Sequence, residues 1–212
     1  FGNAYLRVKE GNNIYMKAKA ATAAASDARM AGENLSAMSC ASSGNVGITA
    51  SIPLCVIAQE QGISEELLLR ALSLSFLLTI FIKNQIGRLS AMCACAIAAS
   101  IGVGAGVVVL SKGSFEEVEG TIKNIVGSIG GIICDGAKLG CALKLSNAIG
   151  TAIESAYLAM EGVSIPSGDG LVCDSADETL RMLGRIARYG MIDTDKTVCK
   201  EIIQREGAEK TE

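Results

Sequence analysis

The stretch from Leu89 to Leu110 contains no charged residue, and it constrains the fold more than any other part of the sequence. Its length reaches that of a membrane-spanning helix. It is, however, rich in Ala, Gly, Ser and Cys and poor in the large apolar residues that face lipid. A helix that is apolar on all sides can equally be the central helix of a soluble bundle. We favour the buried central helix and keep the membrane span as the alternative.

The composition of the whole chain favours close-packed helices. Half of the 212 residues are apolar, but only 4% are aromatic and only two are prolines. With few large rings available, helices must contact each other through small side chains. No stretch alternates for long between apolar and polar residues, as a half-buried strand would. We therefore predict an all-α fold, a single helical domain over residues 1–212 with roughly seven to eight helices around a buried, uncharged central helix.

Helix starts can be read from serines that precede acidic residues. A Ser at the N-cap and a Glu three residues later satisfy each other's backbone N–H groups in a capping box, and acidic residues in the first turn suit the helix dipole. Ser114 with Glu117 and Ser175 with Glu178 have the spacing of a capping box. Ser64 stands before an acidic first turn, Glu65 and Glu66.

Charge and residue counts exclude several classes of function. The net charge is −3 and the isoelectric point is about 5.2, so the chain has no basic surface for nucleic acid. The chain contains no histidine, which removes the usual zinc sites, Ser–His triads and the commonest general base. Eight cysteines without a signal-peptide pattern indicate reduced thiols in a cytoplasmic protein.

Two groups of cysteines lie where we expect buried helices to begin. In residues 130–144, GGIICDGAKLGCALK, Cys134 follows two glycines, and we expect Asp135 and Gly136 to open the next helix. Cys93 and Cys95 stand near the start of the uncharged stretch. The dipole at a helix start favours a thiolate, which is the form that binds metals. We read the two groups as a metal or cluster site, with inert packing as the alternative.

Spacing limits which cysteines can act together. Cys93 and Cys95 would lie on different faces of a helix, so only one of them would point easily at a shared site. Cys134 and Cys141 would share a face but stand about 10 Å apart along the helix. Cys55, Cys173 and Cys199 have no neighbour at ligand spacing, and we expect them to be buried, inert thiols.

Two short polar segments are further candidates. Ser42–Asn45, with sequence SSGN, is most simply a helix cap, but its amides and hydroxyls could also hold a substrate carboxylate. The patch from Lys83 to Arg88 is by default a solvated loop. Because it closely precedes Cys93, a role in lining the site is the alternative.

Three separated motifs carry a family resemblance: NVGITASIPL, KNQIGRLSAMCA and GIICDGAKLGCALK, in that order. Together they resemble the iron–sulfur L-cysteine desulfidases, whose relatives are the iron–sulfur L-serine dehydratase alpha chains and an uncharacterised bacterial branch. The resemblance runs from about Lys17 to Gly190. It implies an all-helical region that holds a [4Fe–4S] cluster through three cysteines and leaves one iron open for substrate.

Carried over position by position, the resemblance assigns roles within this chain. Cys93 and Cys134 match two of the cluster ligands. The third ligand of the desulfidases comes from near the N-terminus of the full chain, and no segment here matches it. The chain thus resembles the C-terminal catalytic part of a longer enzyme, which agrees with its beginning at Phe1.

The implied reaction is β-elimination from L-cysteine or L-serine, giving pyruvate, ammonia and sulfide or water. Lys138 or Lys83 would be the base, and Ser43, Gly44, Asn45 and Asn84 would bind the substrate. The implied partners are a small amino acid, the missing N-terminal segment or a second subunit, and further copies of the chain; no nucleic acid or membrane is expected. The alternative is a non-catalytic helical subunit or inactive relative whose cysteines only pack.

Overall fold

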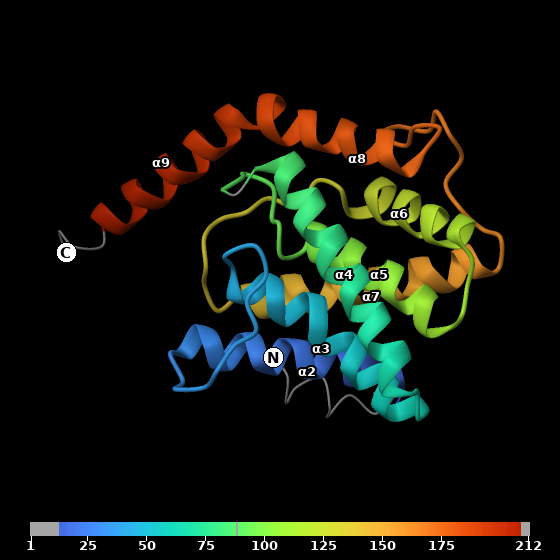
Figure 1. Cartoon of the computed structure of the whole chain (residues 1–212). Helices are drawn as coiled ribbons and strands as arrows, with labels where there is room; N and C mark the ends of the chain where they lie inside the picture. The colour runs from blue at the N-terminus through green and yellow to red at the C-terminus, as the bar shows by residue number, and fades with distance from the viewer. Residues whose placement is uncertain (1–12, 88, 209–212) are drawn as a thin grey trace.

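The computed structural model describes residues 13–87 and 89–208, and these residues form a helical bundle. This confirms the all-α fold (Figure 1). The elements in chain order are α2 (Ile14–Ala31), α3 (Gly44–Gln61), α4 (Glu65–Ile86), α5 (Ile97–Leu110), α6 (Phe115–Ile129), α7 (Cys141–Met160), α8 (Ala176–Arg185), the π-helical turn η1 (Ile186–Gly190) and α9 (Ile192–Ala208).

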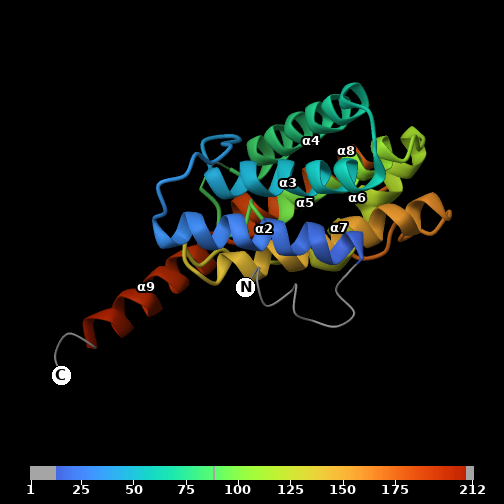
Figure 2. The ribbon, with the colours of Figure 1, turned by 90° about the horizontal axis from the view of Figure 1, so that it is seen from below.

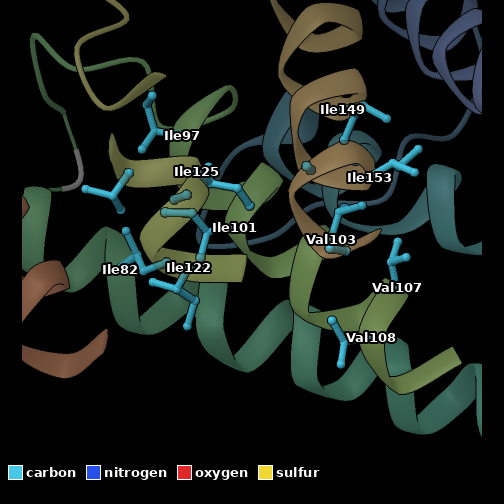
Figure 3. Packing of buried hydrophobic residues seen from close by; sticks show 14 of the residues in the cluster. Ile82, Ile97, Ile101, Val103, Val107, Val108, Ile122, Ile125, Ile149 and Ile153 are labelled. Carbon is cyan, nitrogen blue, oxygen red and sulfur yellow. The ribbon is translucent and has the colours of Figure 1, made fainter. Parts of the chain in front are cut away.

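Helix α5 is the buried central helix that the sequence predicted. Of its residues only Val109 is not fully buried, and α3, α4, α6 and α7 all pack around it. Its isoleucines and valines interlock with those of α4, α6 and α7, as Figure 3 shows for Ile97, Ile101, Ile125 and Ile149. Within the described residues, no helix is long and apolar enough to cross a membrane.

The central helix is shorter than the uncharged stretch that contains it. It begins at Ile97, whereas residues 89–96 form an irregular turn. The backbone of this turn pairs with another segment, through an isolated bridge between Met92 and Ile133. A residue whose amide is used in such a non-local pair is not available to the helix ladder, and the helix starts after the pair.

Serine caps begin the helices as expected. Ser64 caps α4, and Ser114 and Glu117 form a complete capping box at the start of α6. Ser175 accepts a hydrogen bond from the backbone N–H of Glu178 at the start of α8. Ser43 likewise caps α3, which confirms the cap reading of the SSGN segment.

The segment after Cys134 is not helical, and here the expectation from sequence was wrong. Helix α6 ends at Ile129 and α7 begins only at Cys141, so Asp135 and Gly136 lie in a connecting segment. Gly136 has φ +93°, a left-handed conformation that breaks a helix and favours glycine. Cys134 is therefore held by loop contacts.

Three connecting segments meet at one end of the bundle: residues 32–43, 89–96 and 130–140. They lie together on the left in Figure 2, at the starts of α3, α5 and α7. Helix α9 extends away from the other helices toward the same side in both views, and among the described elements its main contact is with η1. The three segments at the bundle end contain the candidate site.

Candidate functional site

Backbone hydrogen bonds join the two cysteine-bearing segments. The amide of Cys93 donates to the carbonyl of Ile132 at 2.8 Å, and the amide of Cys134 donates to the carbonyl of Ala91 at 2.6 Å. With the bridge between Met92 and Ile133, these bonds form a short antiparallel pair between the start of α5 and the segment before α7. Cys93 and Cys134 are thus brought together, as the sequence predicted.

Three sulfurs gather at this pair. The Sγ of Cys93 is 3.5 Å from the Sγ of Cys95 and also forms a hydrogen bond with Cys134. Cys93 is buried, while Cys95 and Cys134 are partly exposed. All three pack against Ala96, Ala148 or their neighbours on α6. The small alanine side chains leave the sulfur atoms room to face one another.

Contact between the thiols changes their pKa values. For Cys93 the hydrogen bond from Cys134 acts to lower the pKa, but the contact with Cys95 together with burial outweighs it, and the pKa rises to about 12. The hydrogen bond with Cys93, followed by burial, raises the pKa of Cys134 well above its usual range. The hydrogen bond with Cys93 lowers the pKa of Cys95. Further ionisation of this group of thiols therefore requires a positive charge close to the sulfurs.

Cys95 was wrongly set apart from Cys93 by sequence reasoning. That reasoning placed both residues on a helix, where they would diverge, but they lie in the turn before α5. The turn bends the chain so that both side chains reach the same place. The C-A-C spacing was visible in the sequence, yet its meaning depends on where the helix begins.

Two further cysteines adjoin these sulfurs: Cys141 lies close enough to Cys95 to oppose the lowering of its pKa by Cys93, and Cys95 packs against the cluster that contains Cys40. Cys141 is buried at the start of α7, where its Sγ lies 3.5 Å from both the amide of Lys138 and the carbonyl of Gly136. It therefore holds the connecting segment in place. Cys55 and Cys199 are exposed, contrary to the expectation of buried thiols, and Cys173 is partly exposed.

Charged side chains surround Cys134. The carboxylate of Asp135 accepts hydrogen bonds from both Lys138 and Lys144. Burial acts to raise the pKa of Asp135, but the two lysines outweigh it and hold the carboxyl below its usual range. Lys144, which sequence reasoning missed, also donates to the carbonyl of Ile133 at 3.0 Å. Lys138, a predicted base, is engaged in this ion pair.

The SSGN segment lies on the other side of the same bundle end. Ala41 and Ser42 have φ values of 48° and 66°, unusual for residues other than glycine, and such strain is most common at functional sites. Two backbone hydrogen bonds of 3.1 Å between Cys40 and Ser43 close the turn. Lys83, buried at the end of α4, donates from Nζ to the carbonyl of Ala41 at 3.0 Å.

Neighbouring contacts fix the start of α3 and link it to the sulfurs. Asn45 is buried and accepts a hydrogen bond from Arg29 at 3.0 Å. The guanidinium of Arg29 also lies directly over Gly44, since a Cβ built there would be 2.4 Å from its Nε. Cys95 packs against the cluster that contains Cys40. The turn that holds Ser43 is therefore linked to Cys95 through Cys40, and Lys83 is bonded to the same turn.

Asn84 does not share the buried position of its neighbour Lys83. It is exposed, and its backbone carbonyl accepts a hydrogen bond from Arg188 of η1. Its predicted place in the substrate site has no support from these contacts.

The chemistry of the three thiols can be compared with that of metal-binding sites. Within residues 13–87 and 89–208, no set of three or more His, Cys, Asp and Glu side chains is arranged to hold one metal ion. Iron–sulfur clusters take Cys thiolates and spread their charge over several metal atoms. Three thiols from two paired segments are suitable donors for such a group, and Lys144 stands beside them as a compensating positive charge.

Comparison with known proteins supports one family. A sequence model described as the serine dehydratase alpha chain matches residues 3–200. A UPF0597 protein of Desulfotalea psychrophila is 46% identical over 183 residues, which cover 86% of this chain and 42% of that protein. A UPF0597 protein of Caldanaerobacter subterraneus is 43% identical over 189 residues, 89% of this chain and 45% of that protein.

A third relative, a UPF0597 protein of Clostridium tetani, is 40% identical over 196 residues, 92% of this chain and 46% of that protein. The chain thus spans less than half the length of these curated relatives. No solved structure matches it. The match to the family's sequence model covers nearly the whole sequence, thiol-bearing segments included, and the chain therefore belongs to the serine dehydratase alpha chain family.

Proposed function

We propose that this chain carries the iron–sulfur site of a β-eliminating lyase that acts on L-cysteine or L-serine. The observation that carries the proposal is the contact between Cys93 and Cys134, two thiols from separate segments that the backbone pairs directly. Membership of the serine dehydratase alpha chain family supports a lyase-type activity. The cysteines would be the part of the chain that holds a [4Fe–4S] cluster.

The bound cluster would act as a Lewis acid that makes the β-thiol or β-hydroxyl of the substrate a better leaving group. Cys93 and Cys134 would hold it, with Cys95 as a third thiol beside them. The loss of the α-proton and of the leaving group, as H₂S or water, gives aminoacrylate. This product then takes up water to yield pyruvate and ammonia.

The start of α3 would orient the substrate. The first backbone N–H groups of a helix have no partner within the helix and favour an anion. Ser43 and Gly44 stand at this position, and Asn45 keeps Arg29 over it. A substrate carboxylate bound here would be held between the amides and the guanidinium.

Lys83 is the base that the geometry favours. It is buried, and it lies between the strained turn before α3 and the segment that leads to Cys93. Lys138 is half exposed and paired with Asp135, so it is less available to accept a proton. In its neutral amine form, Lys83 would take the α-proton of the bound substrate on its nitrogen lone pair and become the ammonium, which can still donate to the carbonyl of Ala41.

We also propose that the site is completed by chain beyond this sequence. Six exposed apolar residues, here named the apolar rim, surround the bundle end that holds the thiols: Leu35, Met38, Leu89, Ile133, Leu139 and Leu143. Apolar side chains gathered around a site are typical of a surface that a partner covers. The relatives are more than twice as long as the part matched here, and we propose that this additional length covers the rim.

Iron and sulfide content, measured after anaerobic reconstitution of a protein of the relatives' full length, tests the cluster. We expect the wild type to bind both and Cys134→Ala and Cys93→Ala to lose most of them. Cys55→Ala, which changes an exposed thiol on α3, should bind as much as the wild type. An equal content in all four proteins, or none in the wild type, would refute the cluster.

Release of pyruvate from L-cysteine and L-serine, assayed without air in a protein of the relatives' full length, tests the reaction. We expect activity that Lys83→Met and Cys134→Ala abolish and Lys138→Met leaves largely intact. If the cluster binds but neither amino acid is consumed, the chain is a non-catalytic relative. If Lys138→Met is the inactive variant, the base has been assigned to the wrong lysine.

A further inference from the structure

Lys144 forms hydrogen bonds with the residues on both sides of Cys134. It lies in the first turn of α7, and its Nζ donates to the carbonyl of Ile133 at 3.0 Å and to the carboxylate of Asp135. These two residues immediately precede and follow Cys134 in sequence. A single ammonium group therefore ties both neighbours of the thiol to a regular helix.

The position of Lys144 distinguishes it from the other lysine of the same ion pair. The side chain of Lys144 is 28% exposed, whereas that of Lys138 is 48% exposed. Lys138 belongs to the same connecting segment as Asp135, and its side chain donates to the carboxylate of that residue. Lys144, in contrast, links that segment to a separate element, and its charge lies close enough to Cys93 and Cys134 to act on both thiols.

We infer that Lys144 is a positioning residue that fixes Cys134 in the site and balances the negative charge of the sulfur-bound group. The first part of this inference concerns the chain alone, and the second rests on the proposed function. Residues 130–140 form no regular structure, so few backbone hydrogen bonds hold the thiol of Cys134 in place. The positioning contact of Lys144 is needed for this reason.

Hydrogen exchange in the iron-free chain tests the positioning role. The amide of Cys134, bonded to Ala91, reports directly on how well the segment is held. Loss of a hydrogen bond from a charged group should speed exchange at this amide roughly tenfold in Lys144→Met. Lys138→Met serves as the matched control, and there we expect little change. Amides in the core of α5 should exchange as in the wild type in both variants.

Equal exchange at Cys134 in the wild type and in Lys144→Met would overturn the positioning role. Faster exchange throughout the protein would also overturn it, because the lysine would then support general stability and not this segment. Lys144→Arg, which retains a charged donor, should restore slow exchange.

Reconstituted protein tests the charge-balancing role. We expect Lys144→Met to bind iron roughly tenfold more weakly than the wild type, the effect usual for a residue that supports metal ligands. Lys144→Gln keeps a donor but loses the charge, so its cluster should have a more negative reduction potential than that of the wild type. Lys138→Gln should change the potential less. If the two variants shift equally, the charge-balancing role is wrong.

The two tests separate this inference from the proposed function. If the wild type binds no iron, the proposed function and the charge-balancing role fall together. The exchange of the Cys134 amide still decides the positioning role in that case.

Discussion

At the scale of single residues, Gly47 shows how tightly the turn before α3 is packed. A Cβ at this position would lie 2.1 Å from the carbonyl oxygen of Met38 and 2.8 Å from the Cα of Ser39. Both neighbours are backbone atoms, which cannot move as a flexible side chain can. The absence of a side chain at Gly47 lets residues 38 and 39 cross directly over the first turn of α3.

We expect Gly47→Ala to lower the free energy of unfolding by about 3 kcal/mol, as overpacking against a rigid neighbour does. The substitution would also displace the turn that we propose binds the substrate. Urea denaturation measures the effect.

Gly131→Ala is the matched control, because no atom lies within 4 Å of an added Cβ there and the residue lies in a loop at the same end of the bundle. Its stability should stay within about 0.5 kcal/mol of the wild type. A tolerated Gly47→Ala would show that the turn can shift.

Sequence reasoning identified individual site residues unevenly. Cys93 and Cys134 were found from their expected places near helix starts and then from the family motifs, and Ser43 was found through the chemistry of helix caps. Lys144 could not be found, because its role depends on folding back over residues that precede it by a full connecting segment. Contacts of this kind are set by tertiary structure and leave no periodic signal.

At the scale of elements, glycines along α5 allow its neighbours to approach closely. A Cβ on Gly102 would lie 2.5 Å from the backbone carbonyl of Ser75 on α4, and one on Gly106 would lie 2.6 Å from a methyl group of Leu54 on α3. The central helix thus contacts different helices through different glycines.

Gly102→Ala tests which of two opposing effects is larger. Alanine favours the helix over glycine by about 1 kcal/mol. Forcing α4 and α5 apart costs about 1–3 kcal/mol, and because the contact is with backbone we expect the upper part of that range. The variant should therefore be less stable by about 1–2 kcal/mol in thermal or urea unfolding.

Gly150→Ala on α7 isolates the propensity effect. An added Cβ there meets only the flexible end of Lys19, 3.2 Å away. We expect its stability to be unchanged or higher by up to about 1 kcal/mol. If Gly102→Ala proved as stable as Gly150→Ala, the close approach of α4 and α5 would not matter for stability.

Most elements could be predicted because their signals are local. The serine caps of α4, α6 and α8 and the uncharged run of α5 each lie within a few residues of the feature they specify. The start of α5 was misplaced because the pairing of Met92 with Ile133 decides it, and the start of α7 was misplaced because Gly136 takes a left-handed conformation. Met92 and Ile133 are far apart in sequence, and neither helix pattern contains information about the other.

At the scale of the whole molecule, the apolar rim departs from an ordinary solvated surface. Its most exposed member, Leu89, is 98% accessible, and Leu35 and Leu139 are also well exposed. If additional chain covers the rim, the 212-residue chain alone should bind an apolar fluorescent dye at this end.

We expect the double variant Leu35→Lys, Leu139→Lys to bind several-fold less dye at unchanged thermal stability, because exposed side chains contribute little to the core. The control is a second double variant, Leu69→Lys, Leu77→Lys, on the exposed face of α4. It should reduce dye binding less. A larger loss of dye binding in the control variant would place the dye-binding surface on α4.

The pairing of residues 91–93 with 132–134 also bears on the order in which the molecule is assembled. It closes a loop of roughly forty residues that consists mainly of two consecutive helices, so its entropic cost is modest. The turn before α3 joins this end of the bundle through contacts of α2, α3 and α4. We therefore expect the pairing of the two cysteine-bearing segments to form early in folding and the turn before α3 to be fixed later.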